Sequence, residues 1–278
     1  MLKSGEYLVA AALLAVHTVV ITLPGRAARL AASNVVTNLI RVEALEKAAP
    51  PYVVFAGSSM TGRIPEQAAT EAAGMTVVNL GLDGCGPADS IKHLLERERL
   101  PVMVIIEGNT INSIGEDNSR TVREQFTGVG AWLHASVPFM RYRERPVDVL
   151  YSWLRYRSLP SGESAAETLA VPAAVPPPAT APDLPPKLQG DIETLESVAR
   201  TLQQKGVRLF VFMLPDNQRD RTEQYLAVKW LTAKLAIPMI DLKAPHEASL
   251  TYSDAVHLDL ASARRIARSI GQWIRNAP

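Results

Sequence analysis

The chain of 278 residues is poor in cysteine, in aromatic residues and in net charge. It has one cysteine, Cys85, which excludes a disulfide framework and a cluster of cysteine metal ligands. Its 29 Lys and Arg residues nearly balance its 28 Asp and Glu residues, which leaves a net charge of +1. Such a balance creates no basic field that would attract nucleic acid, so we expect no nucleic-acid partner.

Two kinds of ligand motif are also missing. The glycine-rich stretch GLDGCGP, residues 81–87, lacks the lysine and the helical context of a phosphate-binding loop. No set of His, Cys, Asp and Glu residues shows the spacing of metal ligands. We therefore expect a site without metal or cofactor, built from the ordinary side chains of the chain.

One long apolar run stands out, YLVAAALLAVHTVVITL at residues 7–23. A helix of about 20 apolar residues crosses a hydrocarbon core of about 30 Å, so we expect residues 1–33 to be an uncleaved membrane anchor. A cleaved signal segment, favoured by the small residues after the run, and a buried core helix are the alternatives. The flanking charges, Lys3 before the run and Arg26 and Arg29 after it, do not settle its orientation.

Residues 34–278 alternate between strand-like and helix-like patterns, which predicts one α/β domain. The expected strands are short, branched and apolar on both faces, as in parallel sheets buried between helices. They lie at residues 52–56, 75–80, 102–107, 208–214 and 237–242. The expected helices lie at residues 34–49, 87–99, 191–206 and 260–274. This order predicts a doubly wound, flavodoxin-like parallel sheet of about five strands with helices on both faces and ligands at the carboxyl ends of its strands.

Two segments interrupt the alternation. Residues 160–188 are dense in proline and alanine, so we expect neither helix nor strand there, but a mobile surface insertion, or a lid or partner-docking loop over the site. Residues 132–157, just before it, mix aromatic side chains with arginines. A capping helix pair, a substrate surface and a membrane-facing patch all fit that composition.

Polar groups recur where the expected strands end. Gly57-Ser58-Ser59 follows the first strand, residues 79–84 (NLGLDG) end the second, and residues 107–110 (EGNT) end the third. The segment 254–257 (DAVH) precedes the last helix. Because the carboxyl ends of parallel strands share one rim, these groups are expected to converge. A serine, a glycine, an asparagine and an Asp-x-x-His pair are the components of a hydrolytic site.

These four blocks, in this order, resemble those of the SGNH or GDSL-like hydrolase superfamily. The resemblance spans Gly57 to His257 and implies catalytic roles for Ser59, Asp254 and His257. It also implies that the oxyanion hole consists of Ser59, Gly84 and Asn109. Two positions depart from the usual pattern, since Ser58 and Thr110 stand where many relatives have aspartate. Gly-Ser-Ser is similar to the motif of some membrane-tethered relatives, such as proteins that assist D-alanyl transfer to teichoic acid.

The chemistry of these residue types agrees with the resemblance. A serine hydroxyl needs a base to remove its proton, and a neutral imidazole such as that of His257 suits this task. Asp254 can accept the other ring N–H, whereas Asp259 lies on the wrong side of the histidine for the family pattern. Cys85 is expected to be a small buried residue, and Glu107 a structural carboxylate at a strand end.

The resemblance, together with the apolar run, implies a single-pass inner-membrane enzyme whose catalytic domain is periplasmic or otherwise extracytoplasmic. We expect a serine O-acetyltransferase that acts on an extracytoplasmic polysaccharide, with a membrane-bound acyltransferase as a possible donor partner. A carboxylesterase, lysophospholipase or deacetylase that acts on an acylated glycan, a lipid or another ester is the alternative within the enzyme class. A non-catalytic subunit of an export complex is the alternative from another class.

Overall fold

The structure is a computed structural model that describes residues 34–111, 169–178, 180–216, 222–242, 250–254 and 256–277, besides the isolated positions 12, 15 and 132. The chain divides into two units, residues 1–37 with 124–162 and residues 38–123 with 163–278. The expected apolar helix at 7–23 and the segment 132–157 lie outside the described residues apart from those isolated positions. Among the helices that are described, none has the length and hydropathy needed to cross a membrane.

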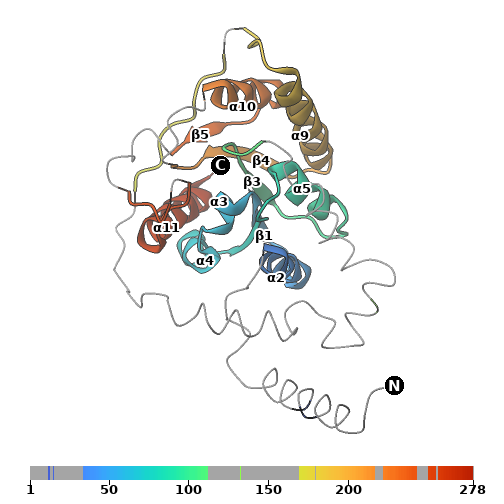
Figure 1. Ribbon diagram of the computed structural model, residues 1–278, viewed down its shortest axis with the longest axis vertical. Helices are drawn as coiled ribbons and strands as arrows, with labels where there is room; N and C mark the ends of the chain where they lie inside the picture. The colour runs from blue at the N-terminus through green and yellow to red at the C-terminus, as the bar shows by residue number, and fades with distance from the viewer. Residues whose placement is uncertain are drawn as a thin grey trace. The chain divides into compact units, whose positions relative to one another are not determined.

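The second unit contains a five-stranded sheet in which all paired strands run parallel, in the order β2-β1-β3-β4-β5 (Figure 1). The strands are β1 (Tyr52–Gly57), β2 (Thr76–Gly81), β3 (Met103–Glu107), β4 (Arg208–Met213) and β5 (Met239–Asp241). All five expected strands are thereby confirmed, each within two residues at either end. Their apolar side chains are buried because both faces of the sheet are covered by helices.

Seven helices are described. They are α2 (Asn34–Lys47), α3 (Ser59–Gly62), α4 (Glu66–Ala73), α5 (Pro87–Leu95), α9 (Pro186–Gln204), α10 (Thr222–Leu235) and α11 (Leu260–Asn276). In Figure 1, α4 and α11 lie on one side of the sheet, with α5 and α9 on the other. Alternate residues of β1, Val53 and Phe55, belong to the apolar core beneath α4 and α11. Trp273 of α11 closes that core with edge-on contacts to Phe210 and Phe212.

The Pro/Ala-rich segment differs from expectation where it ends. Its last residues, 186–188, form the first turn of α9, because proline is tolerated where a helix begins and its N–H would have no partner anyway. Upstream, the backbone N–H of Leu169 donates to Ser269 Oγ at 2.8 Å, and that of Val175 donates to Met239 O at 2.7 Å. Residues 169–175 are therefore joined to α11 and to the edge strand β5, and the interpretation of the segment as a mobile surface insertion or a lid stays a prediction.

The strand order places the site. From β1 the chain passes to β2 on one side, whereas β3, β4 and β5 continue on the other, so the winding reverses between β1 and β3. In open parallel sheets, the loops at the carboxyl ends of the strands diverge at such a point and leave a crevice where ligands bind. Ser59 follows β1 and Asn109 follows β3. Both therefore lie at the reversal, on the rim of carboxyl strand ends where the sequence predicts them.

Candidate active site

Ser59 is held at the start of a short helix directly after β1. Ser58 is the N-cap of α3, and its hydroxyl accepts a hydrogen bond from the Met60 N–H at 3.2 Å. The same hydroxyl donates to Glu107 at 2.8 Å. Ser58 is buried and committed to these contacts, whereas the side chain of Ser59 is left to face another part of the chain.

That other part is the segment before α11. The hydroxyl oxygen of Ser59 lies 2.9 Å from Nε2 of His257, and Nδ1 of His257 lies 2.8 Å from Asp254 Oδ2. The approach of Ser59 and His257 predicted from the sequence is thereby confirmed, as is the pairing of His257 with Asp254. Residues 198 positions apart in the chain are brought together by the sheet and the segment before α11.

The second carboxylate oxygen of Asp254 shapes the segment that presents the histidine. Asp254 Oδ1 accepts hydrogen bonds from the backbone N–H groups of Val256 and His257, each at 2.8 Å. The hydrogen bond from the His257 ring, followed by those two backbone bonds, lowers the pKa of Asp254 from 3.8 to about 2. Since an ionised carboxylate only accepts hydrogen bonds, Asp254 favours the tautomer of neutral His257 that carries its proton on Nδ1, and this tautomer leaves the Nε2 lone pair for Ser59.

Asp259 has a different task, in line with the sequence analysis. It is the N-cap of α11 and accepts a hydrogen bond from the Ser262 N–H at 2.8 Å. The hydroxyl of Thr251 also donates to its carboxylate. These contacts fix the start of α11, immediately after the segment that carries His257.

The backbone N–H of Ser59 is placed to bind a ligand. As the first residue of α3 it has no intrahelical carbonyl to bind. Its neighbours are satisfied by side chains, because Met60 donates to Ser58 Oγ while Ser58 and Thr61 donate to Glu107 at 2.9 and 3.1 Å. Among the described side chains, none accepts from the Ser59 N–H. The helix start thus leaves one donor beside the Ser59 hydroxyl.

Gly84 lies in the loop between β2 and α5, with a positive φ of 74°. This left-handed conformation favours glycine, which has no Cβ to clash with the backbone. Within the described part of the chain its N–H donates to no acceptor. Its expected role as an oxyanion donor stays a prediction.

Asn109 is not placed as the resemblance implied. Its side chain is 1% exposed, and its Nδ2 donates to Leu214 O at 2.8 Å and to Asp216 Oδ2 at 2.9 Å. Its Oδ1 accepts from the Leu214 N–H at 2.6 Å. With both amide hydrogens engaged, Asn109 ties the end of β3 to the loop after β4, and it does not act as an oxyanion donor in this arrangement.

Glu107, at the end of β3, holds the turn that contains Ser59. Its carboxylate is buried and accepts hydrogen bonds from the N–H and hydroxyl of Ser58 and from the N–H and hydroxyl of Thr61. The expectation that Glu107 is structural is confirmed, because its partners are residues of the turn that holds Ser59. The two positions that depart from the family pattern also meet here, since Ser58 Oγ and Thr110 Oγ1 lie 3.3 Å apart.

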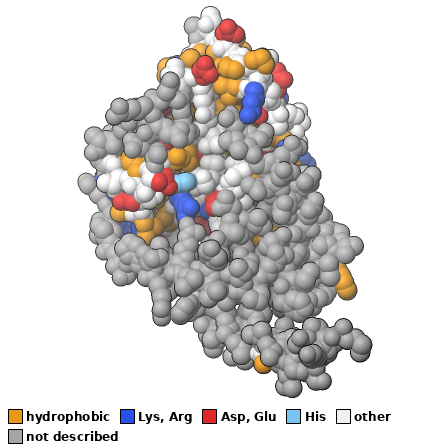
Figure 2. Space-filling view, in the orientation of Figure 1, with side chains coloured by type: hydrophobic (Ala, Val, Ile, Leu, Met, Phe, Trp, Pro, Cys, Tyr) orange, Lys and Arg blue, Asp and Glu red, His pale blue; other side chains and the backbone are white. Residues whose placement is uncertain are grey.

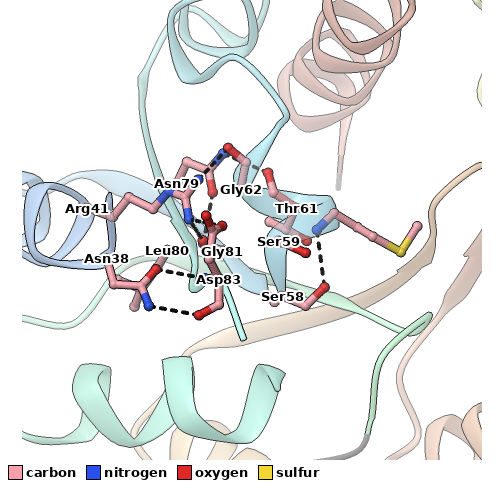
Figure 3. Close-up of polar contacts among 12 residues, drawn as sticks. Asn38, Arg41, Ser58, Ser59, Thr61, Gly62, Asn79, Leu80, Gly81 and Asp83 are labelled. Atoms are coloured by element: carbon pink, nitrogen blue, oxygen red, sulfur yellow. Dashed lines mark hydrogen bonds and ion pairs between the residues drawn. The ribbon is translucent and has the colours of Figure 1, made fainter. Parts of the chain in front are cut away.

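Two residues of α2 that the sequence analysis did not single out also reach the site. Asn38 and Arg41 bind the loop after β2, and Arg41 additionally binds the end of α3 (Figure 3). Both fall on the helix face that buries Val42 and Leu45. The sequence therefore did contain a signal for these contacts, because an amide and a guanidinium on an otherwise buried helix face need partners elsewhere in the fold.

Other reactive groups stay outside the site. Cys85 is buried, and burial, followed by the charges of Asp89 and Asp83, raises its pKa to about 12, which agrees with its expected structural role. The described residues contain no group of three or more His, Cys, Asp and Glu side chains able to hold a metal ion. On the face shown in Figure 2, acidic and basic side chains of the described residues are interspersed.

Comparisons with known proteins add little. No family model matches the chain, and no curated protein matches it. Among solved structures, the chain is similar to a candidate acylhydrolase from Bacteroides fragilis NCTC 9343, with 14% sequence identity and a TM-score of 0.44. That similarity covers 86% of this chain and 97% of the other. At such a distance the roles of individual residues must come from the geometry of this chain.

Proposed function

We propose that this chain is a serine-dependent acyl-ester enzyme of the SGNH or GDSL-like type, with Ser59 as the residue that carries the acyl group. The observation behind this proposal is the hydrogen-bonded series from Ser59 Oγ to His257 Nε2 at 2.9 Å and from His257 Nδ1 to Asp254 at 2.8 Å. A nucleophile, a base and a group that orients the base, in contact at the switch point of a parallel sheet, form a site for acyl transfer.

In the first half of the reaction, the Ser59 oxygen attacks the carbonyl carbon of the ester while His257 Nε2 accepts the hydroxyl proton. Asp254 stabilises the imidazolium that forms, and the carbonyl oxygen becomes a negatively charged oxyanion. Collapse of this intermediate breaks the bond to the leaving alcohol, which takes the proton back from His257. The acyl group is then attached to Ser59 as an ester.

The oxyanion needs preorganised donors, and the N–H of Ser59, which binds no acceptor among the described residues, is suited to be one. The N–H of Gly84 is our second candidate. Removing one such donor typically costs about 3 kcal/mol of transition-state stabilisation. Since the amide of Asn109 is engaged with Leu214 and Asp216, the backbone alone supplies the donors in this proposal.

The assignment of Ser59 over Ser58 can be tested by covalent labelling. We expect the full-length Ser59→Ala protein to lose labelling by a serine-directed fluorophosphonate and to lose hydrolysis of short-chain model esters. Ser58→Ala is the matched control, because it removes a neighbouring hydroxyl that is buried and bonded to Glu107. It should still be labelled. Equal labelling of the wild-type and Ser59→Ala proteins would remove Ser59 from the mechanism.

The finer proposal is that the acyl group is acetyl and that its acceptor is a hydroxyl of an extracytoplasmic polysaccharide. In the second half-reaction His257 deprotonates whichever hydroxyl sits above the acyl ester, so the chemistry accepts water or sugar equally. The side chain of Asp254 is 56% exposed and that of His257 20% exposed, which leaves this side of the site open to a large acceptor. The similarity of Gly-Ser-Ser to membrane-tethered relatives favours a glycan over a small alcohol.

Separate measurement of two products tests the finer proposal. The protein is supplied with an activated acetyl ester, with and without oligosaccharide acceptors, and acetylated glycan and free acetate are each quantified. Acetylated glycan should form only when both Ser59 and the acceptor are present. If free acetate accounts for all turnover with every acceptor, the protein is an esterase or deacetylase.

A non-catalytic scaffold is disfavoured because such a role needs no hydrogen-bonded Ser59, His257 and Asp254.

A further inference from the structure

The loop that carries Gly84 is held from outside the sheet by the first described helix. Asn38 of α2 pairs with the backbone of Asp83, donating to its carbonyl at 3.0 Å and accepting from its N–H at 2.7 Å. Arg41, one turn further along α2, forms an ion pair with the Asp83 carboxylate at 2.7 Å. The backbone and the side chain of Asp83, the residue before Gly84, are therefore both bound by side chains of α2 (Figure 3).

The same guanidinium also binds the helix that starts with Ser59. Arg41 Nη2 donates to the carbonyl of Gly62, the last residue of α3, at 2.8 Å, and Nη1 donates to the carbonyl of Gly81 at the end of β2. One side chain thus connects the Ser59 helix, the strand beside it and the loop of Gly84. The guanidinium and the Asp83 carboxylate are 12% and 7% exposed, so water weakens this contact little.

The packing beneath Arg41 leaves no room for adjustment. A Cβ on Gly81 would lie 2.7 Å from the Ser58 carbonyl oxygen, and one on Gly62 would lie 2.6 Å from Arg41 Cζ. The two backbones touch because glycine occupies both positions, and the guanidinium closes their junction. A small displacement of Arg41 therefore moves the Ser59 helix and the Gly84 loop relative to each other.

We propose that Arg41 is a positioning residue that sets the distance between the Ser59 N–H and the Gly84 N–H, and thereby the geometry of the oxyanion hole. This inference rests on the function proposed above. Arg41 touches no reacting atom in it. It acts through the carbonyls of Gly62 and Gly81 and the carboxylate of Asp83, all three of which it binds.

Arginine suits this task and lysine does not. A planar guanidinium offers five N–H donors in a fixed fork and so reaches three acceptors at once, whereas an ammonium on a flexible stem is a compact point charge. We expect Arg41→Lys to keep the charge opposite Asp83 but to lose the fixed spacing of the two backbone carbonyls. A displacement of about 1 Å in a catalytic constellation lowers the rate by about 100-fold.

The test compares full-length Arg41→Lys with Arg200→Lys. Arg200 is the matched control because it also pairs with a carboxylate, Glu196, and with a backbone carbonyl, that of Lys234, but on α9, outside the site. For Arg41→Lys we expect kcat for a model ester and the rate of fluorophosphonate labelling to fall about 100-fold, with KM changed less than about threefold. Arg200→Lys should change neither rate.

Hydrogen–deuterium exchange of residues 58–63 and 81–86 provides a readout that does not depend on activity. Exchange there should rise in Arg41→Lys and stay at the wild-type level in Arg200→Lys, while exchange in the rest of the sheet stays at the wild-type level in both variants. Wild-type labelling and exchange in Arg41→Lys would overturn the inference and leave the proposed function intact. Faster exchange at residues 58–63 and 81–86 in Arg41→Lys, together with a wild-type protein that is never labelled at Ser59, would retain the positioning role of Arg41 but refute the proposed enzyme.

Discussion

The carboxylate beside the turn that holds Ser59 comes from Glu107, at the end of β3. Ser58 and Thr110 stand where the superfamily that the sequence resembles often has aspartate, and their hydroxyls lie 3.3 Å apart beside Glu107. The buried Glu107 carboxylate binds the Ser58 N–H and the Thr61 N–H directly. The Glu107 carboxylate therefore orders the turn that holds Ser59, and the hydroxyls of Ser58 and Thr110 occupy the two positions where aspartate is common in the superfamily that the sequence resembles.

We expect Glu107→Gln to lower the rate of Ser59 labelling strongly and the stability of the fold moderately. The amide keeps one acceptor oxygen but turns an NH2 group toward the N–H and O–H donors of Ser58 and Thr61, so at least one buried donor loses its partner. We expect destabilisation of about 1–3 kcal/mol. Fluorophosphonate labelling of Ser59 should fall by about 10- to 100-fold, because the turn that aims its hydroxyl loosens.

Denaturant unfolding and labelling kinetics measure the two effects of Glu107→Gln separately. Glu71→Gln on α4 is the control, since Glu71 is exposed and its carboxylate binds only the exposed side chain of Gln67 among the described contacts. If Ser59 is labelled at the wild-type rate in Glu107→Gln under conditions where both proteins are fully folded, Glu107 does not order the turn.

Asp254 predicts a pH dependence of stability at the acid end. Its pKa is lowered from 3.8 to about 2 by the hydrogen bond from His257 and then by the backbone N–H bonds, so the folded state holds the proton less tightly than the unfolded state. The stabilisation is therefore complete above about pH 4 and is lost as the pH falls through about 2. It is small, because the carboxylate is largely exposed and screened by solvent.

The corresponding experiment follows the unfolding midpoint of wild-type and Asp254→Asn proteins from pH 6 down to pH 2. The difference between them should be constant above pH 4 and shrink towards pH 2. A difference that persists unchanged at pH 2 would mean that the ionised form is not the one that stabilises the segment before α11.

Among the elements, α4 and α11 illustrate how small residues allow close packing. A Cβ on Gly271 of α11 would lie 2.5 Å from the Ala69 carbonyl oxygen and 2.7 Å from Ala72 Cβ. The alanines of α4 and the glycine of α11 thus let the two helix backbones approach directly. This contact matters for the site because α11 begins just after His257, at Leu260.

Gly271→Ala should therefore destabilise the fold, because an added methyl group must push the two helices apart, at a cost of about 1–3 kcal/mol. Gly190→Ala on α9 is the matched control, since a Cβ there meets no atom within 4 Å. It should be neutral or stabilising by up to about 1 kcal/mol, because alanine favours the helix. Thermal or denaturant unfolding of both variants measures the contrast. Equal stability would disprove the close contact between α4 and α11.

At the scale of the whole molecule, the apolar run at residues 7–23 leads us to propose that the site lies near a membrane, on its extracytoplasmic side. If this apolar run anchors the chain and the enzyme acts on surface polysaccharide, the α/β domain lies outside the cytoplasm. A reporter fused after Pro278 measures this directly. Alkaline phosphatase should be active in that fusion and a cytoplasmic reporter inactive. The reverse result would place the site in the cytoplasm and exclude an extracytoplasmic glycan as substrate.

The sequence by itself determined the features that arise from local patterns. Branched apolar runs indicated the five strands, because such runs are buried on both faces of a parallel sheet. The resemblance of Gly-Ser-Ser and Asp-x-x-His to the motifs of a known hydrolase superfamily indicated Ser59 and the Asp254–His257 pair, and that pair interacts across only three residues. The parallel order of the strands was enough to predict that these groups meet.

Only the tertiary structure decided which distant partner each polar group takes. Asn109 binds Leu214, 105 residues away, instead of facing the oxyanion, and Arg41 reaches across 40 residues to the end of β2. Glu107 selects Ser58 and Thr61 nearly 50 residues upstream. The physical reason is that a buried donor or acceptor must find some partner, but the chain offers many candidates of the same chemistry. Which one lies within 3 Å depends on how the helices and strands pack.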